Sequence, residues 1–165
     1  MKRLCTFFAT IGLLTAFTAS AWADQRILDF DTMNGVDGPF LGNANPIRGV
    51  NGGGLPWVID RGRGKLDHDG KLDVQVRGLI IPDIIGFGFN PAPFFRVVVS
   101  CLSVDANGLV AVVNVTTNNG AEVMIGDPRN GDARFKTDVN LPTPCVAPIL
   151  FVTSPGSSWF SATGL

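Results

Sequence analysis

General-base catalysis by histidine would have to depend on His68, because it is the only histidine in this 165-residue chain. It stands between Asp67 and Asp69, in a segment with the composition of a tight turn. A serine hydrolase needs its histidine within hydrogen-bond reach of the nucleophile, and a turn does not hold a base so firmly. We therefore expect a solvated turn here and no catalytic triad.

Carboxylates are the other groups that could do chemistry, and the chain has thirteen Asp and one Glu. A glycoside hydrolase needs two carboxylates facing each other across a cleft, and the sequence leaves open which pairs converge. A carbohydrate-active hydrolase with paired Asp residues is therefore the alternative to a non-catalytic function. Asp67, Asp69 and Asp73 with Gly70 resemble part of a calcium loop, but the distant Glu that completes such a loop is missing. We expect neither a metal site nor a cofactor.

The segment 49–54 is rich in glycine, a composition that suits a phosphate-binding loop. Such a loop ends in Lys followed by Ser or Thr and opens a helix, whereas Leu55, Pro56 and Trp57 follow here. We expect these glycines to permit a bend or close packing of the backbone. Trp57 and Trp159 are interpreted as packing aromatics rather than as a carbohydrate platform.

The first 23 residues have the three parts of a secretory signal peptide. Lys2 and Arg3 precede an uncharged run that ends in Ala21-Trp22-Ala23, and we expect cleavage after Ala23. An uncleaved membrane anchor is the alternative, but the apolar run is short for a spanning helix, which needs about 20 mostly apolar residues. We therefore predict a secreted protein, extracellular or periplasmic, without stable membrane insertion.

Removal of that leader leaves residues 24–165, a length that fits one domain. They carry 11 basic and 14 acidic side chains, and so a net charge of −3. Arg61, Arg63 and Lys65 come nearest to a basic patch, and we interpret them as the solvated face of a strand. Nucleic acid is accordingly not an expected partner.

Cys101 and Cys145 are the two cysteines of the exported part, and an even number in an exported chain predicts a disulfide. His68 alone could join them as a further nitrogen or sulfur ligand, which is too few for a closed zinc site. Cys145 follows the proline-rich segment 142–144 and precedes an apolar run. The disulfide would therefore fix a stiff crossing to a central strand.

Alternation of apolar and polar residues with a period of two predicts strands that have one buried face. Leu72, Val74 and Val76 show it most clearly, against the polar residues between them. No window of 24–165 has helical periodicity, and we expect almost no helix. The predicted strands are 26–33, 55–66, 71–80, 94–103, 109–117, 121–126, 132–141, 147–153 and 157–163.

Turn signals separate these strands. The segments 67–70, 105–108 and 130–131 each end in Asp-Gly or Asn-Gly, which favour the positive φ of tight turns, and they predict three hairpins. This pattern predicts an all-β fold, a single-domain antiparallel β-sandwich of about 7 to 9 strands, with a closed β-barrel as the alternative. A small outer-membrane barrel is disfavoured by the absence of Tyr and by the predicted disulfide.

The predicted loop 81–93 contains apolar side chains that could form either a binding surface or part of the core. Ile84, Ile85, Phe87 and Phe89 lie there among Gly and Pro. An exposed apolar patch usually has a partner, although side chains of this type are more often buried. These four residues are the candidate binding loop, with core packing as the alternative.

Three pairs of motifs are the basis of a family resemblance. They are NPIRG at 45–49 with LPW at 55–57, PFFR at 93–96 with SCL at 100–102, and LP at 141–142 with FVTSP at 151–155. In them the chain resembles a family of small secreted, mainly bacterial, uncharacterised all-β proteins. The resemblance spans nearly all of the chain after the leader and implies export and the cysteine pair, but no activity and no site residue.

The most economical functional prediction is a secreted, non-catalytic binding or structural module. Its partner would be an extracellular protein or glycan, which the long loops 34–54 or 81–93 would meet.

Overall fold

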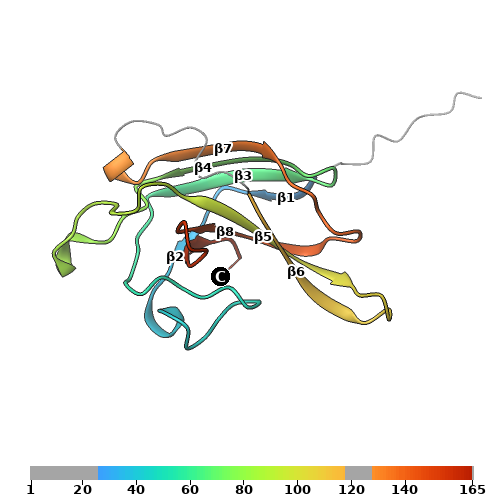
Figure 1. Cartoon of the computed structure of the whole chain (residues 1–165). Coiled ribbons are helices and arrows are strands. Elements are labelled where there is room, and N and C mark those ends of the chain that lie inside the picture. Colours follow the sequence, from blue (N-terminus) through green and yellow to red (C-terminus); the bar gives the residue numbers. More distant parts are fainter. Residues whose placement is uncertain (1–25, 118–127, 165) are drawn as a thin grey trace, which may run out of the picture.

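The computed structural model describes residues 26–117 and 128–164. The strands are β1 (Arg26–Phe30), β2 (Asn34–Gly35), β3 (Arg61–Asp67), β4 (Lys71–Arg77), β5 (Arg96–Val104), β6 (Val110–Thr116), β7 (Ala133–Asp138), β8 (Val146–Thr153) and β9 (Trp159–Ala162), and the 3₁₀ turns are η1 (Gly38–Phe40), η2 (Asp83–Ile85) and η3 (Pro128–Asn130). Sheet A has the order β1-β3-β4-β7 and sheet B the order β2-β9-β8-β5-β6, and all pairings of named strands are antiparallel. Figure 1 shows sheet A lying over sheet B. The predicted all-β sandwich is confirmed, and the two sheets do not close into one barrel.

Eight of the nine predicted strands have a counterpart, and the ninth, 121–126, lies outside the described residues. The prediction 55–66 is wrong at its start, because β3 begins at Arg61. Proline occupies position 56, and Val58 pairs with Ile80 only through an isolated bridge. No α-helix occurs in the described part of the chain, and none there could span a membrane.

Two of the three predicted hairpins are confirmed. The turns at 67–70 and 105–108 join β3 to β4 and β5 to β6. Gly131 has the expected positive φ, 72°, and leads into β7. The strand predicted to precede that third turn falls in the part of the chain that the structure does not describe.

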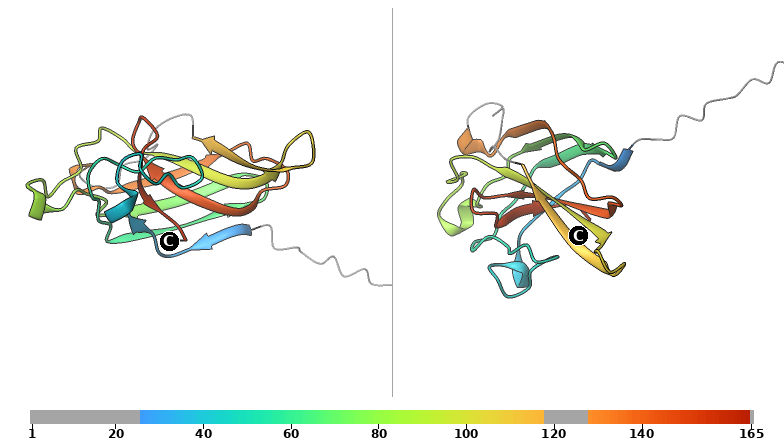
Figure 2. Two further views of the ribbon diagram at one scale, coloured as in Figure 1. Left: turned by 90° about the horizontal axis from the view of Figure 1, so that it is seen from below. Right: turned by 45° about the vertical axis from the view of Figure 1, so that its right-hand side comes forward.

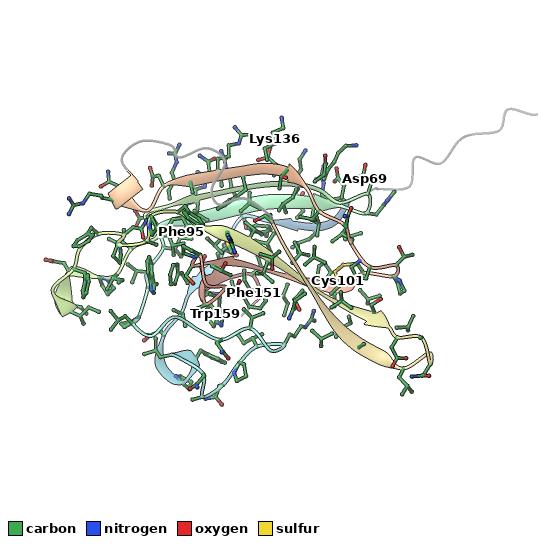
Figure 3. The ribbon with its side chains drawn as sticks, in the orientation of Figure 1. Asp69, Phe95, Cys101, Lys136, Phe151 and Trp159 are labelled. Atoms are coloured by element: carbon green, nitrogen blue, oxygen red, sulfur yellow. A yellow bond between two sulfur atoms is a disulfide. The ribbon has the colours of Figure 1, made fainter. Side chains whose placement is uncertain are left out.

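The main core lies between the two sheets. Leu72, Val74 and Val76 of β4 are at most 2% exposed, as their alternation predicts. Val74 lies opposite Phe135 of β7, whose side chain is also buried. The polar residues between them point away from sheet B, and in Figure 3 Lys136 of β7 points to the same outer side. Sheet A therefore has one buried and one solvated face.

The central part of sheet B is covered on both faces. On β5, Val98 and Ser100 are as buried as the residues that face sheet A. The segment 34–54 lies under sheet B in Figure 1 and covers this side. One link between them is the hydrogen bond that Arg48 Nη1 donates to the carbonyl oxygen of Ser100, at 3.0 Å. The predicted loop 34–54 therefore starts in β2 of sheet B and continues as a third layer of the fold.

Trp57 and Trp159 pack in these cores, as predicted. Trp57 stacks on Phe160 with 3.7 Å between ring centroids. Trp159 has no exposed surface, and its ring lies 6.3 Å from that of Phe40 and 6.0 Å from that of Phe151. The Phe40 contact joins segment 34–54 to sheet B.

Glycines permit the close approach of this third layer. A Cβ on Gly52 would lie 1.9 Å from the carbonyl oxygen of Phe40, so only glycine fits there. The amide of Gly52 donates to Gly42, and the amide of Gly53 donates to Trp159. Because these amides are already used, the segment does not offer them to a phosphate, and the predicted packing role is confirmed.

The disulfide between Cys101 and Cys145 is present. Cys101 lies fully buried in β5, and Cys145 directly precedes β8, the neighbouring strand in sheet B. The bond therefore fixes the end of the crossing that leads from β7 in sheet A to β8 in sheet B.

Candidate functional site

The segment 81–89 projects from one end of the sandwich as a small hairpin. Figures 1 and 2 show it standing away from both sheets in every view. Two backbone hydrogen bonds close its base, from the Ile81 amide to the Phe89 oxygen at 3.3 Å and from the Gly88 amide to the Ile81 oxygen at 3.0 Å. The Ile81 side chain is 3% exposed and anchors this base in the core.

The tip of this hairpin carries large apolar side chains in solvent. Gly86 follows the turn η2, and its positive φ of 88° lets its backbone amide donate to the Asp83 oxygen at 2.7 Å. Ile84 is 92% exposed, Ile85 40% and Phe87 37%. These three side chains therefore do not pack in the core, which was the alternative for the candidate binding loop.

Phe89, the fourth candidate residue, belongs to the stem and is half-buried. Its ring lies 5.8 Å from that of Phe87, and the Arg129 guanidinium of η3 lies 4.8 Å from its centroid. The backbone amide of the next residue, Asn90, donates a hydrogen bond of 2.7 Å to the backbone oxygen of Arg129. These contacts fix the stem, so the tip is held in place before any partner arrives.

No family model, curated protein or solved structure matches the chain. The resemblance to small secreted proteins therefore stays a prediction.

The turn at 67–70 has the solvated character that the sequence predicts. His68 is exposed at its tip. Asp69 accepts a hydrogen bond of 2.7 Å from Lys71 Nζ, which lowers the pKa of Asp69 and raises that of Lys71. Asp73 accepts instead from Arg134, and this bond raises the pKa of Arg134. Across 26–117 and 128–164, no three His, Cys, Asp or Glu side chains are grouped so that they could hold a metal ion.

Carboxylates do gather on the outer face of sheet A. Asp29, Asp31 and Asp73 help to line an open hollow of about 470 Å³. Asp29 is ion-paired with Arg26, and Asp73 with Arg134 at 2.9 Å. Two of the three carboxylates are thus engaged by guanidinium groups, an arrangement that suits an ion-pair network better than a pair of catalytic acids.

A second exposed apolar group, which the sequence analysis missed, lies on the β5–β6 hairpin. Val104, Leu109 and Val110 are 51%, 65% and 75% exposed. Figure 1 shows this hairpin extending away from the end that carries 81–89. Its Val-rich sequence is typical of a buried strand, and no sequence signal marks β6 as the edge of sheet B.

Proposed function

We propose that this protein is a secreted, non-catalytic binding module that contacts an extracellular protein or glycan through the tip of the 81–89 hairpin. The observation that carries the proposal is the exposure of Ile84, Ile85 and Phe87 on a fixed stem. Leaving such side chains in water is unfavourable unless a partner covers them. A stem that is already ordered also reduces the entropy lost on binding.

The disulfide supports export, which is part of the proposal. A disulfide such as Cys101–Cys145 persists in oxidising compartments and is rare in the cytosol. The predicted signal peptide, 1–23, lies outside the described residues and stays a prediction. Residues 26–117 and 128–164 offer no specific support for the alternative, a hydrolase with paired Asp residues.

The double variant Ile84→Ser, Phe87→Ser tests the proposal. The mature protein is first screened on a glycan array and against a panel of exported proteins, and each hit is titrated with the variant. We expect binding to weaken at least about tenfold, because exposed apolar anchors dominate such interfaces. Stability should change by less than about 0.5 kcal/mol, since neither side chain is in the core.

The matched control is Leu109→Ser, which removes a large apolar side chain, 65% exposed, from the other hairpin. This control should bind the same hits with unchanged affinity. Hits that the tip variant binds as tightly as the native protein, or an equal loss in the control, would contradict the proposal. So would the absence of any hit, or a marked drop in the melting temperature of the tip variant.

A further inference from the structure

The outer face of sheet A gathers basic side chains from its four strands. Eight of the eleven basic residues in 24–165 lie there, all of them exposed. They are Arg26 on β1, Arg61, Arg63 and Lys65 on β3, Lys71 and Arg77 on β4, and Arg134 and Lys136 on β7. In Figure 3 the labelled Lys136 points from this face into solvent, away from Phe95, Phe151 and Trp159. A chain with a negative net charge therefore carries most of its basic side chains on one face.

Over most of this face, acidic residues balance the basic ones. Lys65 lies between Asp29 and Asp73 in the sheet register, and Asp73 lies between Lys65 and Lys136. Such alternation of opposite charges across strands stabilises a sheet. This part of the face is accounted for by folding alone.

The end of the sheet where β3 begins and β4 ends is different. Arg61 lies directly opposite Arg77. In the next row Arg63 donates two hydrogen bonds, of 2.7 and 3.1 Å, to Oε1 of Gln75. These four side chains line a hollow of about 240 Å³ that has no carboxylate in its wall. Three guanidinium groups therefore meet without an acid between them.

This arrangement costs stability. Like charges directly opposite each other in a sheet are destabilising. Neither Arg61 nor Arg77 has an ion pair or a side-chain hydrogen bond with any residue of 26–117 or 128–164. Local choices that work against the fold are characteristic of functional sites. A bound anion between the two guanidinium groups would remove the repulsion.

The surface next to Arg61 and Arg77 indicates which class of anion would bind there. Arg61, Arg63 and Gln75 also line the 470 Å³ hollow, so the two hollows form one open trough across the sheet. Asp29 and Asp31 stand in its second half. They would repel a duplex phosphate backbone, with about one charge per 1.7 Å, more strongly than a polyuronate, which carries one charge per sugar residue. They would accept hydrogen bonds from sugar hydroxyls.

We propose that this trough binds an acidic polysaccharide, with a uronate carboxylate held between Arg61 and Arg77. Guanidinium groups bind carboxylates through two parallel hydrogen bonds, and Arg63 and Gln75 fix the floor of the site. Sugar hydroxyls of the flanking residues lie against Asp29 and Asp31. This site is separate from the tip at 84–87 and does not depend on it.

The test is titration of the mature protein with polygalacturonate oligomers at low and at physiological salt. We expect binding that weakens with salt, and no binding of neutral dextran. The double variant Arg61→Gln, Arg77→Gln should bind about 10- to 100-fold more weakly, the loss expected for charge-assisted hydrogen bonds. Its melting temperature should not fall, because the variant also removes a repulsion. Arg61→Lys, Arg77→Lys keeps both charges without the planar guanidinium groups and should lie in between.

Lys71→Gln is the matched control, since it removes one charge from β4 at the far end of the same face. It should change affinity less than twofold. The proposal is overturned if native protein does not bind polygalacturonate, or if the control loses as much as the arginine variant. It is equally overturned if duplex DNA, anionic lipid vesicles or inorganic sulfate bind this site more tightly than the polyuronate does.

Discussion

Replacing Cys101 and Cys145 together with alanine is expected to lower the free energy of unfolding by about 4 kcal/mol. The two residues are 44 apart in sequence. A covalent link over that separation removes many conformations from the unfolded chain, and this is the main source of its stabilisation in the chain-entropy model. A loss of this size is a large part of the stability of a small domain. Urea titration of the native protein and of the variant measures it.

Reduction of the native protein provides the control for this prediction. It breaks the same bond without creating the small cavity that alanine leaves beside the buried Cys101. We therefore expect a similar but slightly smaller loss on reduction. A loss below about 1 kcal/mol in both cases would mean that the crossing into β8 is held by its other contacts, against the chain-entropy argument.

Much of the fold could be predicted because sheet A has one solvated face, so its strands alternate apolar and polar residues. In β4, inward Val74 and Val76 alternate with outward Asp73 and Gln75, and this alternation reports burial directly. Sheet B gives no such signal, since segment 34–54 covers its second face. Whether Ser100 of β5 is buried depends on that cover, which lies about 50 residues earlier in the chain.

The apolar tip of 81–89 and the arginine pair on sheet A could be predicted from the sequence to different degrees. The apolar residues of 81–89 stand out in the sequence, although their exposure depends on a hairpin that holds them away from the core. The pairing of Arg61 with Arg77 was missed, although a signal for it exists. The turn at 67–70 fixes the register of β3 against β4, and counting back from it brings these two residues together. The position of Arg134 beside Gln75 has no such local signal, because β7 is distant in sequence from β4.

Replacing Trp159 with alanine is expected to lower the free energy of unfolding by about 3–5 kcal/mol. The side chain is fully buried, and its ring contacts Phe40 of the covering segment 34–54 on one side and Phe151 of sheet B on the other. Its loss leaves a cavity at the contact that joins the third layer to the sheet. Urea titration measures the loss, and limited proteolysis should cut within 34–54 faster than in the native protein.

The variant Trp159→Phe distinguishes the contribution of ring packing to stability from that of the indole N–H. The indole Nε1–H is buried and finds no acceptor in the described part of the chain, so removing it forfeits no hydrogen bond. Because a smaller ring still fills most of the space, we expect less than half of the alanine loss. Val110→Ala, at an exposed apolar site, should cost less than about 0.5 kcal/mol. If phenylalanine is as damaging as alanine, the indole N–H has a partner, and the third layer is held by a hydrogen bond rather than by packing.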